Sequence, residues 1–298
     1  MVRNATKYYF PIKESIASAL PLVDEFIVAL GKGDVDDATR EQLLSLNSPK
    51  IRIIDRVWNE ADFADGKVFA DETTFALSEC TGDWCLYLQA DEVLHEQDIT
   101  AIKKACLLHN DNTNVDGLLF DYFHFWGDYE HYLPYHGWYK KEIRIVRNFA
   151  DIVSYKDAQS FRKKNGVKLN VACVAAHVYH YGWVRPPSTM KRKKTEQDNI
   201  HHPSRKLAVA DSDALANFNY GAMGKVPIYK GTHPATMAIK IASIDWQLQL
   251  NYTKYALLNR PKMKHERLKY RLLTRLENLL GVQLGGYSNW RICKYCKK

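Results

Sequence analysis

Two adjacent carboxylates, Asp91 and Glu92, follow directly after a short apolar run at residues 84–90. Such a run predicts a buried strand, so the acidic pair lies where that strand leaves the core. Carboxylate oxygens there can bind a metal ion or accept hydrogen bonds from a ribose. In the structural alternative Asp91 caps the helix predicted at residues 96–108, although Asp98 is better placed for that cap.

A second acidic loop, residues 33–39, contains Asp34 and Asp37 and follows an apolar run at residues 23–30. Residues 36–47 have helical spacing, and Asp37 is a plausible N-cap for that helix. A β-branched run, which predicts a strand, follows at residues 50–58. Residues 69–80 repeat the helical pattern before the 84–90 run. This alternation predicts parallel strands joined by right-handed crossovers, which bind ligands at their carboxyl ends. Both acidic loops fall at that edge.

The middle of the chain is rich in aromatic and basic residues, at positions 120–148. Aromatic rings beside cations suit sugars and phosphates, while the structural alternative is a hydrophobic hairpin with a solvated basic edge. An apolar strand then carries His180 within residues 171–187. A histidine in such a run is either a hydrogen-bonded core residue or, if it reaches Asp91, a ligand.

The last third of the sequence is polar, basic and then helical in pattern. Residues 188–202 read as a linker or lid, with a solvated basic face as the alternative, and residues 234–252 and 260–284 have helical spacing. The second helical segment carries a leucine stripe among many Lys and Arg residues. A basic amphipathic helix either covers a core or lies on an anionic membrane, so this one is a candidate for peripheral membrane contact.

Composition narrows the classes of protein and partner. The net charge of +8 over 298 residues favours anionic partners, and 46% hydrophobic content is that of a globular protein. Six scattered cysteines in a chain of this length fit reduced thiols in a cytoplasmic location. The pair Cys293 and Cys296 has no second pair to complete a zinc site. The apolar runs are shorter than the roughly 20 residues of a membrane span.

The order of these motifs resembles inverting family-two glycosyltransferases of the GT-A fold, in particular bacterial enzymes of the lipopolysaccharide-core type. The motifs are GDWCLYLQADE, HGWYKKEIRIVR and YHYGWVR, within a resemblance that spans roughly residues 4–190. It implies an α/β, Rossmann-like core at residues 1–190 with a mostly parallel central sheet and flanking helices. A basic linker or lid and a helical C-terminal region occupy residues 191–298. The family begins with an apolar strand, and residues 2–4 resemble its end, so we expect the first strand to be truncated.

The resemblance assigns a role to each candidate residue. Asp91 and His180 become ligands of Mg²⁺ or Mn²⁺, and Gln89 occupies the first acidic position of the family's metal motif. Asp157 becomes the general base, with a turn aspartate before a helix at residues 158–164 as the alternative. The remaining assignments are nucleotide-sugar contacts from Asp34, Asp37, Arg144 and Arg147, and acceptor stacking on Trp138 or Tyr139.

These roles imply an inverting transferase of polysaccharide biosynthesis that moves a sugar from a nucleotide-sugar donor to a glycan or glycolipid acceptor. The alternative is a non-catalytic nucleotide- or carbohydrate-binding protein on the same fold, favoured by Gln89 and by the truncated strand. A nucleic-acid-binding face ranks last, because the basic residues form no recognisable nucleic-acid motif. We therefore expect no nucleic-acid partner.

Overall fold

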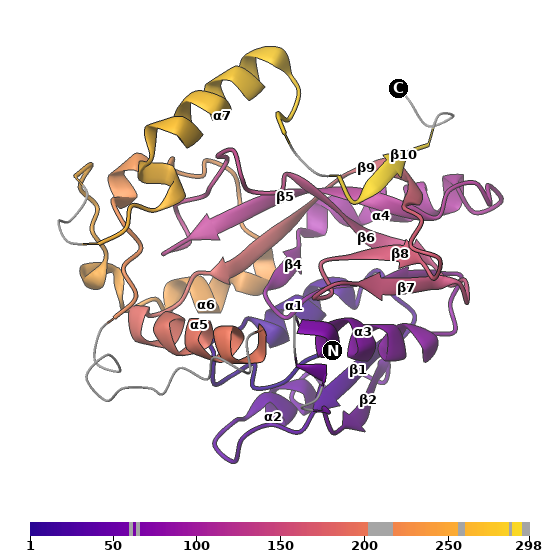
Figure 1. Ribbon diagram of the computed structural model, residues 1–298. Helices are drawn as coiled ribbons and strands as arrows, with labels where there is room; N and C mark the ends of the chain where they lie inside the picture. Colours follow the sequence, from indigo (N-terminus) through magenta and orange to yellow (C-terminus); the bar gives the residue numbers. More distant parts are fainter. Residues whose placement is uncertain (60–61, 64–65, 202–216, 256–259, 286–287, 294–298) are drawn as a thin grey trace.

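The computed structural model describes residues 1–59, 62–63, 66–201, 217–255, 260–285 and 288–293. Over these residues the chain is a mixed α/β protein with a central six-stranded sheet and two small two-stranded sheets (Figure 1). The helices are α1 Ile12–Ala19, α2 Thr39–Leu44, α3 Lys67–Ser78, α4 Ile99–Leu108, α5 Pro187–His201, α6 Ala238–Ala242 and α7 Leu268–Leu280. The strands are β1 Phe26–Gly31, β2 Ile51–Arg56, β3 Trp84–Leu86, β4 Glu92–Leu94, β5 Gly117–Trp126, β6 Lys141–Arg147, β7 Ile152–Tyr155, β8 Ser160–Lys163, β9 Leu169–Trp183 and β10 Trp290–Ile292.

The first part of the chain follows the predicted strand, helix, strand order. β1 and β2 pair in parallel from Phe26 and Ile51 onward, with α2 between them in sequence. Their apolar, β-branched sequences explain why both form strands. The N-cap position of α2 is Ala38 rather than the predicted Asp37, but the Asp37 side chain, one residue earlier, accepts a hydrogen bond from Thr39 N at 3.2 Å.

The central sheet is mixed rather than mostly parallel, which corrects the sequence prediction. Its order is β10-β9-β5-β6-β3, and β4 pairs with β9. β5 and β10 run parallel to β9, whereas β3 and β5 are antiparallel to β6 and β4 is antiparallel to β9. The long strand β9 pairs with β10 along its first half and with β4 along its second half. The second pairing places Glu92 opposite His180.

Two segments have a secondary structure that the sequence did not indicate. Residues 187–201 form helix α5, and their interpretation as a linker or lid stays a prediction. Residues 160–163 form strand β8, paired with β7, where the alternative interpretation placed a helix. The helical pattern at residues 234–252 gives only short helices, including α6.

One aromatic core connects the sheet to the residues that follow α5. Phe125 and Tyr181 stack with ring centroids 4.8 Å apart, and Trp246 donates a hydrogen bond to the Gly127 carbonyl at 2.8 Å. Tyr220 belongs to the same buried cluster. Most aromatic residues of the middle segment thus form core rather than a surface platform. The division into residues 1–190 and 191–298 stays a prediction. Cys296 lies outside the described residues.

Candidate functional site

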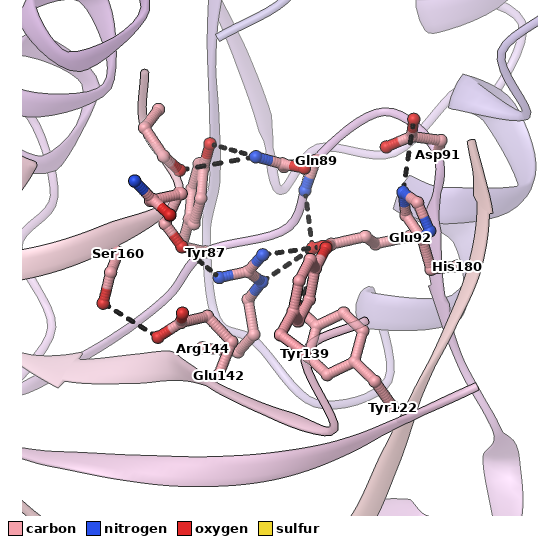
Figure 2. A network of polar contacts seen from close by, with 12 residues as sticks. Tyr87, Gln89, Asp91, Glu92, Tyr122, Tyr139, Glu142, Arg144, Ser160 and His180 are labelled. Atoms are coloured by element: carbon pink, nitrogen blue, oxygen red, sulfur yellow. Dashed lines mark hydrogen bonds and ion pairs between the residues drawn. The ribbon is translucent and has the colours of Figure 1, made fainter. Parts of the chain in front are cut away.

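The loop between β3 and β4 carries Asp91 to the second half of β9. The Asp91 carbonyl accepts a hydrogen bond from Tyr181 N at 2.8 Å, and its side chain is 6% exposed. Asp91 Oδ2 lies 3.7 Å from His180 Nε2 and 3.7 Å from Lys193 Nζ on α5. Residues far apart in sequence, Asp91 and His180, therefore face each other, as Figure 2 shows.

The hydrogen bonds of His180 decide which of its nitrogens carries the proton. Burial lowers the pKa of His180 to about 4 and that of His124 to about 3, so both rings are neutral at neutral pH. His124 Nε2 lies 2.7 Å from the Tyr139 carbonyl oxygen, which can only accept, so that nitrogen is protonated. His124 Nδ1 then accepts from His180 Nδ1 at 3.0 Å. This leaves His180 Nε2 with a free lone pair directed at Asp91.

Gly182 packs directly against both groups. A β-carbon on residue 182 would lie 2.5 Å from His180 Nε2 and 2.6 Å from Asp91 Oδ2, closer than any side chain can approach, so only glycine fits at this position. Sequence reasoning missed Gly182, although the glycine stands next to the nominated histidine in YHYGWVR.

Two buried cations adjoin this pair. Arg185 is 0% exposed and donates to the carbonyls of Tyr8 and Gly182 at 2.6 and 2.9 Å. Lys193 donates to the same Gly182 carbonyl at 3.0 Å. Burial and the charge of Arg185 lower the pKa of Lys193 to about 7, against the opposing effect of Asp91. Burial raises the pKa of Asp91, but the electrostatic effects of His180 and of the Lys193 and Arg185 cations outweigh it, and the net shift is downward.

We call Asp91, His180, Gly182, Arg185 and Lys193 the Asp91 cluster. One carboxylate oxygen and one imidazole lone pair, 3.7 Å apart, are two donors of the kinds that bind a divalent cation. Among the residues that the structure describes, no three His, Cys, Asp or Glu side chains group as a metal site. The remaining ligands would have to come from substrate oxygens and water.

A polar cavity of about 550 Å³ lies on the other side of the β3–β4 loop. Gln89 belongs to the same β3–β4 loop as Asp91, but its side chain lines this cavity. There its Nε2 donates to the Ala158 carbonyl at 3.4 Å. Asp157 and the exposed ring of Tyr139 line this cavity, and Asp91 does not. The full lining is Gln89, Tyr139, Lys141, Glu142, Arg144, Asp157, Gln159, Gln283, Ser288, Asn289 and Trp290. Its polar character suits a carbohydrate.

Asp157 is held in a tight turn whose two flanking residues have left-handed backbone angles. Lys156 has φ of 56° and Ala158 has φ of 61°, which is unusual for residues other than glycine. The buried Oδ1 of Asp157 accepts no hydrogen bond from the described residues. Backbone strain beside an unpartnered carboxylate oxygen is typical of functional positions. Asp157 therefore lines the cavity with one buried, unpartnered oxygen, and its role as the base stays a prediction.

Arg144 and Arg147 are both engaged in contacts within the fold, and their contact with a nucleotide sugar stays a prediction. Arg144 Nη2 and Nε donate to the two oxygens of Glu92 at 2.7 and 2.8 Å, and both side chains are fully buried. Its charge is therefore satisfied, and it holds the β3–β4 loop in place (Figure 2). Arg147 lies opposite Trp84 at the other end of β3. It donates to backbone carbonyls after α4, including that of Asn110 at 2.7 Å.

The other nominated residues divide between surface and framework. Asp34 is 38% exposed at its side chain and pairs with Lys7 at 2.6 Å, so it remains accessible to a ligand. Asp37 is used within the fold, because it accepts from the Thr6 hydroxyl at 2.6 Å and from Lys7 N at 3.1 Å. Burial alone would raise the pKa of Asp37. The hydrogen bonds from Thr39 and Thr6 lower it by more, so the net shift of the pKa is downward.

Trp138 is not a free stacking platform. Its ring packs against Trp126 and Trp183, each with centroids 5.8 Å apart, within the aromatic core. Tyr139, by contrast, is 40% exposed and lines the polar cavity. Only Tyr139 of the two nominated aromatic residues is thus placed to contact a ligand there.

No protein-family model matches this sequence, and neither does any curated protein.

Proposed function

We propose that this protein is an inverting glycosyltransferase of the GT-A fold that transfers a sugar from a nucleotide-sugar donor to a glycan or glycolipid acceptor. The observation that carries this proposal is the Asp91 cluster, which brings together a carboxylate, a free imidazole lone pair and two buried cations. A nucleoside diphosphate bound to a divalent cation has the complementary charges.

The donor diphosphate would lie beside Lys193 and Arg185, whose charges stabilise the negative charge that develops on the leaving group. Asp91 and His180 would hold Mg²⁺ or Mn²⁺, which supplies further charge neutralisation at that group. Asp34 and Lys7 lie farther along the same rim, joined to Arg185 through the backbone of Tyr8. This arrangement supports a ribose and base contact at Asp34.

Asp157 supplies the general base for the acceptor. An acceptor hydroxyl in the polar cavity would give its proton to the unpartnered Oδ1 as it attacks the anomeric carbon from the face opposite the diphosphate. Inversion follows from that opposite-face attack. Tyr139 offers an exposed ring against which an acceptor sugar can pack.

Helix α7 supports an acceptor that is presented at a membrane surface. Leu268, Leu272, Leu276 and Leu279 are 66%, 47%, 47% and 81% exposed, so the predicted leucine stripe faces outward. The buried residues of α7 are Thr274 and Glu277. No described helix has the length and hydropathy needed to cross a bilayer. An outward apolar stripe flanked by Lys and Arg is suited to anionic lipid headgroups.

A non-catalytic binding protein remains the second candidate, because the side-chain amide of Gln89 is used within the fold. Its Nε2 contacts the Ala158 carbonyl and the Tyr87 hydroxyl, each at 3.4 Å, rather than facing the Asp91 cluster. A protein of this kind would bind nucleotide sugars without hydrolysing or transferring them. Titration calorimetry combined with a donor-turnover assay separates the two functions.

The decisive experiment screens nucleotide sugars by thermal shift, with and without Mn²⁺, on the native chain and on Gly182→Ala. The native protein should be stabilised by one donor class and more strongly with Mn²⁺. Gly182→Ala should lose that stabilisation, since its β-carbon clashes with both side chains and must displace Asp91 or His180. Gly82→Ala is the matched control, because a β-carbon there meets only the Trp84 carbonyl at an ordinary 3.6 Å. Equal shifts for all three proteins would rule out the Asp91 cluster as the donor site.

The same screen then distinguishes binding from chemistry with Asp157→Asn. This variant should bind the donor as the native protein does but transfer sugar about 10²- to 10⁴-fold more slowly, because the amide cannot accept the proton. Asp151→Asn, a change at an exposed residue, serves as its control. An unchanged transfer rate in Asp157→Asn would exclude Asp157 as the base.

A further inference from the structure

Three of the six cysteines line one cavity that lies apart from the Asp91 cluster and from the polar cavity. This cavity has a volume of about 680 Å³ and is bordered by β1, β3 and the helices α1, α3 and α4. Cys80 follows α3, Cys85 is the middle residue of β3, and Cys106 lies on α4. All three are free thiols.

The segment between Cys80 and Cys85 is folded back around one side chain. Asn148 Nδ2 donates to the carbonyls of Cys80 and Gly82 at 2.9 and 3.0 Å. Asn148 N donates to the Asp83 carbonyl at 3.0 Å. Because three carbonyls of this short segment are held by one residue, its two ends stay together, and both cysteines pack in the same apolar cluster. We call Cys80 and Cys85 the thiol pair.

The two members of the thiol pair differ in acidity. A hydrogen bond from the Cys85 thiol lowers the pKa of Cys80, as does the charge of Arg52, while burial opposes both effects. The same hydrogen bond and burial raise the pKa of Cys85. Arg52 is held beside this site, since its guanidinium donates to the Glu79 carboxylate at 2.8 Å and to the Glu79 carbonyl at 2.6 Å. Cys80 therefore has the greater thiolate character.

The two members also differ in exposure. Cys80 is partly buried, whereas Cys85 is 7% exposed. A more acidic, accessible thiol beside a second thiol is the arrangement found in redox-sensitive cysteine pairs. Cys106 provides a contrast within the same cavity, because burial raises its pKa to about 11 and keeps it protonated at neutral pH.

We propose that the thiol pair is an oxidation site, at which a hydroperoxide converts Cys80 and Cys85 to an intramolecular disulfide. The pair is reduced at rest, which agrees with the reduced thiols expected from composition. The disulfide would tie the end of α3 to β3, the strand that leads into the loop carrying Asp91. This proposal does not depend on the proposed function.

The oxidation is balanced with one hydroperoxide molecule for each disulfide. The Cys80 thiolate attacks one peroxide oxygen, the O–O bond breaks, and hydroxide leaves, so that Cys80 becomes a sulfenic acid. The Cys85 sulfur then attacks the Cys80 sulfur, the S–S bond forms and the S–O bond breaks. The second hydroxide takes the Cys85 proton. With hydrogen peroxide, two thiols thus give one disulfide and two water molecules, and a thiol reductant reverses the change by exchange.

Peptide mapping after treatment with hydrogen peroxide tests the proposal without any substrate. Free thiols of the folded chain are alkylated at the end of the treatment, and the chain is then cleaved before its aspartates. This cleavage separates residues 71–82 from residues 83–90 and so places the two cysteines on different peptides. The two peptides should be recovered joined, with a mass two hydrogen atoms below their sum, and a reductant should release them.

Three serine variants assign the steps. Cys80→Ser should leave Cys85 open to alkylation, and Cys85→Ser should stop at a Cys80 sulfenic acid that a cyclic 1,3-dione traps. Cys106→Ser is the matched control, since it removes a thiol from the same cavity and should form the disulfide as the native chain does. In the native chain Cys80 should lose alkylation at least about tenfold faster than Cys106, which burial keeps protonated.

Several outcomes would overturn the proposal. One is that Cys80 and Cys85 both remain open to alkylation under peroxide treatment that oxidises Cys106. Another is a Cys80 sulfenic acid that persists in the native chain with no joined peptides. A third is a disulfide between two copies of the chain, which appears as a dimer on a non-reducing gel. The last is a disulfide that forms only when the protein is unfolded in urea.

Discussion

Asp91 and Glu92 are adjacent in sequence but have opposite surroundings. The Asp91 side chain lies against Gly182, 3.7 Å from both His180 and Lys193, and these are ionic or polar contacts longer than hydrogen bonds. Glu92 is 0% exposed and is enclosed by the Arg144 guanidinium and by the Tyr122 hydroxyl, which donates at 2.9 Å. One carboxylate is therefore available to a ligand, and the other fixes the loop that presents it.

Removing one partner of the buried Glu92–Arg144 pair should destabilise the protein strongly. We expect Glu92→Gln to lower the free energy of unfolding by about 3–5 kcal/mol, because it leaves the Arg144 charge buried without a counter-charge. The exposed pair of Arg40 and Asp55 provides the control, and Asp55→Asn should cost about 1 kcal/mol or less. Urea denaturation measures both. Similar losses in the two variants would contradict the structural role of Glu92.

Helix α7 illustrates what periodicity decides at the scale of an element. The leucine spacing correctly predicted a helix, but it could not indicate which face turns inward. The inward face is polar, since Glu277 accepts from His136 at 2.7 Å and from Lys140 at 3.1 Å, and Thr274 accepts from His136 N at 2.8 Å. In Figure 1 the helix lies at the outer edge of the molecule, over the sheet.

Membrane contact through α7 predicts a selective loss of vesicle binding. Leu272→Ser combined with Leu276→Ser should reduce sedimentation with anionic phospholipid vesicles severalfold, because about 25 cal/mol is lost for each Å² of apolar surface removed from the contact. Stability should change little, since both side chains are exposed. Leu107→Ser with Leu108→Ser is the control, as these residues are each 76% exposed on α4. Equal vesicle binding by all proteins would refute the contact.

At the scale of the whole molecule, residues after α5 share a core with the central sheet. Trp246 is 0% exposed and packs edge-on against Tyr9 with ring centroids 5.4 Å apart. It also bonds to the Gly127 carbonyl that follows β5. The first ten residues, the sheet and the C-terminal region thus meet at one side chain. We expect them to unfold together.

This shared core predicts one unfolding transition and a large effect of Trp246→Ala. The substitution should reduce the free energy of unfolding by about 3–5 kcal/mol, the range for truncating a buried aromatic side chain. Leu248→Ala, in the same segment but 102% exposed, should change it by about 0.5 kcal/mol or less. Circular dichroism and tyrosine fluorescence should give the same midpoint. Two separate transitions would instead support independent domains.

Local patterns in the sequence were sufficient to predict the α/β class and the early alternation of strands and helices. It also nominated Asp91 and His180, because apolar runs, helical spacing and a carboxylate at a strand end are local patterns. The predictions that were wrong concern features that depend on residues far apart in the sequence or on a turn. The mixed direction of the sheet follows from how β6 and β9 pair across the chain, and the strand β8 follows a turn with left-handed residues that no periodicity reveals.

Which charged side chains are free to contact a ligand depends on the tertiary structure. Arg144 and Arg147 have the same residue type and lie three positions apart, yet each is already bound within the fold, to Glu92 and to backbone carbonyls respectively. Lys193 came from a segment interpreted as a linker, and its position beside Asp91 depends on the packing of α5. The electrostatics of a buried group depend on its neighbours in space, and a single sequence does not encode those neighbours in a readable local pattern.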